Sequence, residues 1–197
     1  MKIPISKFLD NLQRLILSGE ITTEYSHATR VTPAKIIADC SGFVAWVLMA
    51  TGHKDALREI RNYKYPNHKT GPGWNRIFVR DFVEALEVAE FSNWLVLTGP
   101  EELCDADIMF STDWPVMDDT NHVVFVRHCS PLPDGRFKLR IMDSSRKYIH
   151  FNDTKNEPGI GTGDIFIRPI PDSKMYLIDY SPDYMGLRKR LWFARVI

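Results

Sequence analysis

The sequence predicts an α+β fold in which N-terminal helices pack on an antiparallel β-sheet. In the first half of the chain, apolar residues recur at helical spacing. In the second half, short segments rich in β-branched and aromatic residues follow one another. The turn Pro133-Asp134-Gly135 lies between two of these segments and is typical of an antiparallel hairpin.

Two helices are predicted before residue 52. In residues 1–19 the apolar side chains recur every three or four positions, and Gly19 marks the end of an amphipathic helix. Residues 40–51 are apolar on nearly every face and stop at Gly52, which favours a buried helix over a strand.

Residues 52–74 hold many polar residues, prolines and glycines, and we interpret them as a long connection. A third helix is predicted over residues 75–89, with an apolar stripe formed by Ile77, Phe78, Phe82, Val83 and Leu86.

Six strands are predicted in the second half of the chain, at residues 94–98, 107–112, 122–128, 136–143, 164–170 and 191–197. The run Gly159-Ile160-Gly161-Thr162-Gly163 lacks the spacing of a dinucleotide-binding motif, and we interpret it as a flexible turn.

Length and charge limit the classes of protein that the chain can represent. Its 197 residues predict one domain, with residues 1–19 as a helical extension. The 25 basic and 25 acidic residues cancel, which argues against a dedicated nucleic-acid binder. No run approaches the roughly 20 apolar residues of a membrane span. We expect a cytoplasmic protein as written, or a secreted or periplasmic one if a signal peptide has been removed. No feature of the sequence indicates an oligomeric state.

Three cysteines are too few for a disulfide scaffold, so we expect Cys104 and Cys129 to be buried or surface thiols. The cysteines and histidines also lack the paired spacing of a zinc site, and we expect neither a metal nor another cofactor.

Cys40 stands at the start of the most apolar predicted helix. Asp39 is a candidate N-cap, which places the thiol in the first turn, where the helix dipole and free amides lower a thiol pKa. The same amides can stabilise an oxyanion, and Gly42 lets a substrate approach closely. The alternative is a small buried side chain with no chemistry.

His122 opens the strand at residues 122–128, where it can point into a cleft and act as the general base for Cys40. Asp143 ends the next strand, where its carboxylate can orient that imidazole. The alternatives are a surface histidine at a turn and an aspartate that caps the Asp-Ser-Ser turn.

Together these segments resemble the NlpC-type papain-like cysteine peptidases and amidases, relatives of the CHAP amidases. The segment 39–44 resembles the nucleophile motif of that family, residues 122–124 its histidine strand, residues 106–110 the strand before it, and residues 142–145 the segment of the third polar residue. The resemblance covers roughly residues 20–170 and implies a papain-like fold. It departs from the family at Ser26-His27, at Val124 and at Asp143, which indicates a divergent branch.

The resemblance implies that Cys40 is the nucleophile, His122 the base and Asp143 the orienting group. It also implies that Tyr25, fifteen residues before the cysteine, helps to line the oxyanion site. Asp39 and Ser41 flank the nucleophile and are candidates for the oxyanion or substrate site. The rim of the cleft is expected in residues 52–74, 111–121 and 144–160, with candidate side chains His27, Trp74 and Trp114.

The function expected from these residues is hydrolysis of a small peptide amide through a thioester on Cys40. The resemblance suggests a cell-wall substrate, a murein stem peptide. Two alternatives stay open: a non-catalytic module that binds a peptide or partner protein, and an acyl or side-chain amidase with another substrate. The second alternative predicts an apolar groove beside Cys40.

Overall fold

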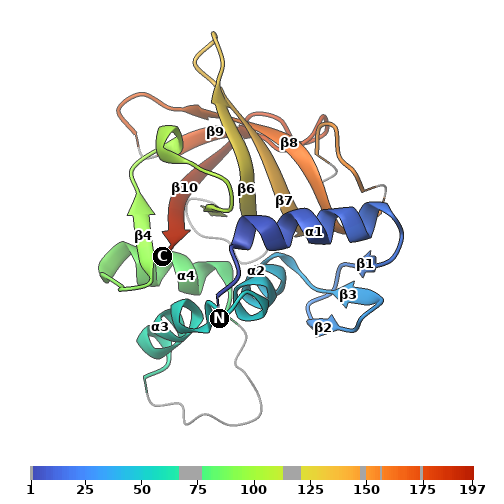
Figure 1. Cartoon of the computed structure of the whole chain (residues 1–197). Helices are drawn as coiled ribbons and strands as arrows, with labels where there is room; N and C mark the ends of the chain where they lie inside the picture. Colours follow the sequence, from blue (N-terminus) through green and yellow to red (C-terminus); the bar gives the residue numbers. More distant parts are fainter. Residues whose placement is uncertain (1, 67–76, 113–120, 147–149, 156, 174) are drawn as a thin grey trace.

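The computed structural model describes residues 2–66, 77–112, 121–146, 150–155, 157–173 and 175–197, and shows four helices gathered on one side of a large sheet (Figure 1). The helices are α1 (Ile5–Leu17), α2 (Cys40–Ala50), α3 (Lys54–Lys64) and α4 (Val79–Val88). Strands β1 (Thr22–Glu24), β2 (Arg30–Val31) and β3 (Lys35–Ile37) form a small sheet. The large sheet contains β4 (Trp94–Leu97), β5 (Ile108–Thr112), β6 (His122–Pro131), β7 (Phe137–Ser145), β8 (Gly159–Pro169), β9 (Met175–Asp179) and β10 (Leu187–Val196).

The large sheet closes on itself, so the predicted papain-like arrangement of helices on an open antiparallel sheet is wrong. Strands β5 to β9 pair in chain order, and β10 then pairs with both β5 and β9. The result is a closed antiparallel barrel of six strands, with β4 added outside the ring on β10.

The closure depends on two features that local sequence patterns do not show. Strand β9 was not predicted, because the segment around it carries no regular alternation. Strand β10 is long enough to pair with β9 over Leu187–Arg190 and with β5 over Arg190–Ala194. The choice of partner strands for β10 depends on the whole chain and not on any local segment.

Side chains alternate between two separate cores along the barrel strands. On β6, Val124 and Val126 belong to the cluster inside the barrel, whereas Val123 and Phe125 belong to the cluster beneath the helices. The same alternation on β5, β6 and β7 places Ser111, His122 and Asp143 on the inward face, at one end of the barrel. The sequence of β6 is apolar on both faces because both faces are covered.

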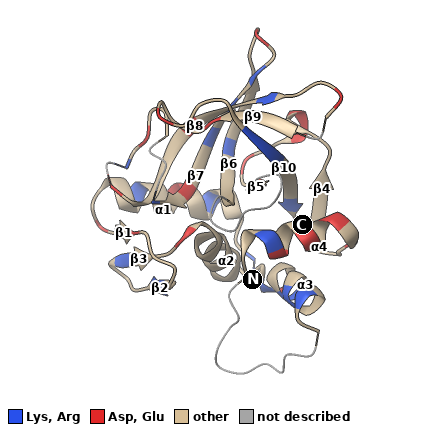
Figure 2. Ribbon diagram, turned by 180° about the vertical axis from the view of Figure 1, so that it is seen from behind, with Lys and Arg blue, Asp and Glu red and all other residues tan. Residues whose placement is uncertain are grey.

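The helices predicted within residues 1–19 and over residues 40–51 are confirmed as α1 and α2. Both are followed by the expected glycine with positive φ, Gly19 at 76° and Gly52 at 84°. Helix α2 carries no charged side chain and is tan along its whole length in Figure 2. It packs against α1, α3 and strands β6 and β7, which explains why an apolar residue suits nearly every face.

Three local predictions are corrected by the structure. Residues 54–64 form α3 and not a connection, because Ala56, Leu57 and Ile60 make a short buried stripe among the polar residues. The third predicted helix is shorter and begins at Val79. The glycine-rich run at 159–163 is the first half of β8 and is buried, not a flexible turn.

The N-terminal helix lies across the barrel and buries Leu9 and Leu12 in the same core as α2. The two ends of the chain lie close together, since the Lys2 ammonium donates to the carbonyl of Ile197 at 3.3 Å (Figure 1). Every helix in the described part of the chain is too short or too polar to cross a lipid bilayer.

Candidate active site

Cys40 is the first residue of α2, as predicted, and Asp39 is the N-cap. The Asp39 carboxylate accepts a hydrogen bond of 2.7 Å from the Gly42 amide and one of 3.3 Å from the Ser41 hydroxyl. Its other oxygen contacts His27 at 3.2 Å. This cap satisfies an amide that the helix leaves without an internal partner and fixes where the thiol lies.

The start of α2 is attached to the barrel through Ala38. The carbonyl of Ala38 accepts a hydrogen bond of 2.7 Å from the Ser144 hydroxyl of β7, and its amide donates to Glu24 at 3.1 Å. Ser144 directly follows Asp143. The Ser144 contact therefore holds the start of α2 against the strand that carries Asp143.

The Cys40 thiol lies against the opening of β6, where it accepts a hydrogen bond from the Val123 amide. Burial raises the pKa of this thiol to about 11, and the amides of Val123 and Ser41 offset only part of that rise. The helix dipole had led us to expect a lowered thiol pKa, so this expectation is wrong. With 9% of the residue exposed, loss of water outweighs the helix terminus, and the thiol rests protonated.

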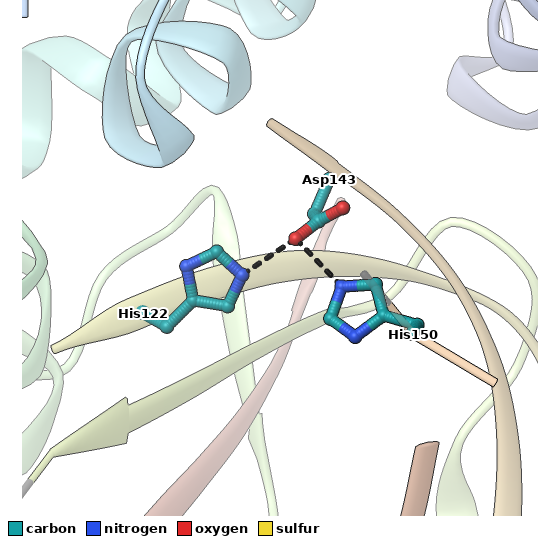
Figure 3. A group of neighbouring side chains, drawn as sticks. All are labelled: His122, Asp143 and His150. Carbon is teal, nitrogen blue, oxygen red and sulfur yellow. Dashed lines mark hydrogen bonds and ion pairs between the residues drawn. The ribbon is translucent and has the colours of Figure 1, made fainter. Parts of the chain in front are cut away.

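His122 and Asp143 are brought together as predicted, although they stand on different strands (Figure 3). The Nε2 atom of His122 lies 2.7 Å from the Oδ2 atom of Asp143, and both side chains are buried. Burial, together with the charges of His150 and Lys155, lowers the pKa of His122, so its ring is neutral near pH 7. Because Nε2 donates to the carboxylate, Nδ1 carries the lone pair that can accept a proton.

Two further side chains hold Asp143, and the sequence analysis did not identify either. His150 Nε2 lies 3.0 Å from the same Oδ2 atom, and Lys155 Nζ lies 2.9 Å from Oδ1. Burial alone would raise the pKa of the Asp143 carboxyl, but Lys155, His150 and the His122 hydrogen bond hold it well below its usual range. Asp143 is therefore ionised although it is fully buried.

A chain of hydrogen bonds runs from His150 back to the main chain of His122. His150 Nδ1 lies 2.8 Å from the carbonyl oxygen of Tyr180, the Tyr180 hydroxyl lies 2.5 Å from the Ser111 hydroxyl, and Ser111 donates to the His122 carbonyl at 3.4 Å. The Tyr180 ring also meets the His122 ring edge-on at 6.1 Å. These contacts fix the orientation of the imidazole from both sides.

The group His122, Asp143 and His150 also has the composition of a metal site. Its ligand atoms lie within 4.8 Å of one another. However, the two imidazoles already contact the carboxylate at hydrogen-bond distance, and the Lys155 ammonium supplies a cation to the same group. The arrangement is complete without a metal ion.

The remaining predicted site residues lie around the start of α2. Tyr25 is half-buried, and its ring lies 5.6 Å from that of His27, which contacts the cap residue Asp39. Ser41 is buried and bonded to the same cap. The rim candidates Trp74 and Trp114 lie outside the described residues.

A cavity of about 520 Å³ runs along α2, on the side of the helix that faces away from the thiol. It is lined from α2 by Ser41, Gly42, Ala45, Trp46 and Met49. Met49 is 2.5 helical turns from Cys40, which places the two residues on opposite faces. This cavity is therefore not the apolar groove beside Cys40 that an acyl hydrolase would need.

The chain matches no family model, no curated protein and no solved structure in the comparisons made.

Proposed function

We propose that the chain is a cysteine-dependent hydrolase that cleaves a small peptide amide through a thioester on Cys40. The proposal rests on the buried 2.7 Å contact between His122 and Asp143. His122 is the first residue of β6, and the amide of the next residue, Val123, donates a hydrogen bond to the Cys40 thiol. An orienting carboxylate, a base and a nucleophile are the components of nucleophilic amide hydrolysis.

The protonation states support activation by proton transfer and not by a resting ion pair. The raised thiol pKa and the lowered imidazole pKa leave Cys40 as a thiol and His122 as a neutral base. His122 Nδ1 takes the thiol proton as the sulfur bonds to the carbonyl carbon. The charge that develops on the carbonyl oxygen meets the Cys40 amide.

Collapse of this intermediate breaks the carbon–nitrogen bond, and the departing amine takes the proton from His122. Water then attacks the thioester and gives one proton to His122. The carbon–sulfur bond breaks, and that proton returns to the sulfur. Asp143 keeps its negative charge throughout and stabilises the imidazolium in both steps.

The proposed substrate, a murein stem peptide, rests on the resemblance of the sequence motifs and not on the fold. The test is incubation of murein stem peptides and unrelated peptide amides with the wild type, Cys40→Ala and Cys104→Ser, followed by mass spectrometry. We expect cleavage by the wild type and by Cys104→Ser, and none by Cys40→Ala. A wild type that cleaves no amide and forms no covalent adduct at Cys40 would contradict the proposal.

The small exposure of the site favours one second candidate, a module that binds a peptide without cleaving it. Cys40 and His122 are 9% and 5% exposed, which leaves little surface for a substrate to reach. This candidate predicts that wild type and Cys40→Ala bind the same peptide with equal affinity and that neither changes it.

A further inference from the structure

The two ring nitrogens of His150 both face groups that can only accept a hydrogen bond. Nδ1 lies 2.8 Å from the carbonyl oxygen of Tyr180, and Nε2 lies 3.0 Å from the Oδ2 atom of Asp143. A carbonyl oxygen and an ionised carboxylate have no hydrogen to donate. A neutral imidazole has one N–H and would leave a lone pair facing an oxygen, whereas an imidazolium satisfies both contacts.

The charge of the buried cluster leads to the same conclusion. Asp143 and Asp153 contribute two negative charges, and Lys155, which lies 2.9 Å from each, contributes one positive charge. The side chains of these three residues and of His150 are at most 5% exposed. A neutral His150 leaves a net buried charge of −1, and an imidazolium brings the sum to zero.

Among the residues that the structure describes, the other titratable groups that face the cluster do not change this sum. They are the Cys40 thiol from α2, the His122 ring from β6 and the Tyr180 hydroxyl that follows β9. The Asp153 carboxylate accepts hydrogen bonds from the His150 and Lys155 amides and from the Lys155 ammonium, which are all donors to an ionised group.

The glycines of β8 make room for these cations. A Cβ atom at Gly163 would lie 2.4 Å from the Cβ atom of His150, and one at Gly161 would lie 3.0 Å from the Cβ atom of Lys155. The segment that carries both cations pairs with β8 through Phe151 and Asp164. The glycine-rich half of β8 thus places His150 and Lys155 against the buried carboxylate.

We propose that His150 is held as an imidazolium and that, with Lys155, it forms a buried cationic pair that positions Asp143 for His122. Both are positioning residues, since they act on the base through the carboxylate. The pair keeps Asp143 ionised although it is buried in the barrel, and it keeps His122 in the neutral form that accepts the thiol proton. The charge proposed for His150 does not depend on any enzymatic activity. The proposed role of His122 as the acceptor of the thiol proton rests on the function proposed above.

The direct test is a nitrogen-15 NMR titration of the histidine side chains in the full-length protein, with His150→Gln to assign the signals. We expect both His150 nitrogens to carry protons at pH 7, while His122 carries one. A His150 ring with a single N–H at pH 7 would overturn the proposal. So would one equivalent of bound divalent metal whose removal by a chelator shifts the His122 and His150 signals.

The second test removes the other cation. In Lys155→Met the midpoint of the His122 titration should move upward by about one pH unit, since a nearby positive charge is lost. Lys138→Met is the matched control, because Lys138 of β7 pairs with Asp164 of β8 at 3.0 Å and lies away from Asp143. An unchanged His122 midpoint in a folded Lys155→Met or Lys155→Gln protein would contradict the positioning role.

These readouts need no substrate, so they separate this proposal from the proposed function. If amide hydrolysis is found, the acid limb of the kcat/KM profile should move upward with the same midpoint in Lys155→Met and not in Lys138→Met. A purely structural role for Lys155 would lower the rate without moving that limb.

Discussion

The Ser144 hydroxyl donates a hydrogen bond of 2.7 Å to the carbonyl oxygen of Ala38, and both residues are fully buried. This bond joins the strand of Asp143 to the residues that lead into α2. Cys40 and Asp143 come from distant parts of the chain, and this contact joins the segments that carry them.

Ser144→Ala should lower the free energy of unfolding by about 1 kcal/mol, since one buried hydrogen bond is lost. It should also lower kcat/KM, because the start of α2 is no longer fixed against β7. Thr51→Ala is the control, since its hydroxyl donates to the Val47 carbonyl at 2.8 Å at the other end of α2. Equal activity in the two variants, measured beside chemical denaturation, would contradict the positioning role of this bond.

Cys40 should react slowly with iodoacetamide at neutral pH. With a pKa of about 11, its thiolate fraction at pH 7.5 is about 100-fold or more below that of a free thiol. The rate in Cys104→Ser/Cys129→Ser should rise about tenfold per pH unit up to pH 10. The exposed Cys104 of the wild type provides the reference rate. Rapid alkylation of Cys40 below pH 8 would indicate a resting thiolate–imidazolium pair instead.

Asp143→Asn should cost both activity and stability. An asparagine leaves buried cations without a charged partner, so we expect about 3–5 kcal/mol of lost stability and a loss in kcat/KM on the order of 10³-fold. Because the carboxyl pKa is lowered in the folded protein, its contribution is full above the unfolded pKa of about 3.9 and is lost as the pH falls below it.

Denaturation of wild type and Asp143→Asn from pH 7 down to pH 3 measures this difference. Asp107→Asn is the control, since Asp107 is a buried carboxylate that pairs with Arg195 far from Cys40. It should lose stability and keep activity. A stability difference for Asp143→Asn that does not shrink in acid would show that the carboxylate is not the ionised partner.

Gly163→Ala should displace His150, because the new methyl group would lie 2.4 Å from the His150 Cβ atom. We expect a loss of about 1–3 kcal/mol from overpacking and a fall in activity larger than that of Ile165→Val, the next inward-facing position of β8. The comparison requires thermal unfolding and kinetics of both variants. A fully active Gly163→Ala protein would show that the position of His150 is unimportant.

Local elements and the His122–Asp143 pair were predictable from the sequence, whereas the closed barrel and the cationic pair were not. Helix α2 and its cap follow from a short segment, Asp39 to Gly52, whose signals are local. His122 opens β6 and Asp143 lies two residues before the end of β7, so the antiparallel pairing of these consecutive strands brings them together. Barrel closure requires β10 to pair with strands far away in the chain, and no local pattern encodes that choice.

His150 and Lys155 were missed for a related reason. The glycines at 159, 161 and 163 were interpreted as a flexible turn, because glycine alternation also suits a loop. A strand with glycine at every second position has no side chains on one face, and another segment must fill that face. This rule indicates that a neighbouring segment packs against β8. The thiol pKa was mispredicted because the helix dipole is visible in the sequence and burial is not.

Strand β10 follows, in chain order, every strand to which it bonds. As the chain emerges from the ribosome, β4, β5 and β9 keep unpaired edges until Leu187–Val196 arrives. We therefore expect the candidate active site at the end of the barrel to form only after this segment is made. A premature stop before residue 187 should give an aggregating product and not a shortened hydrolase.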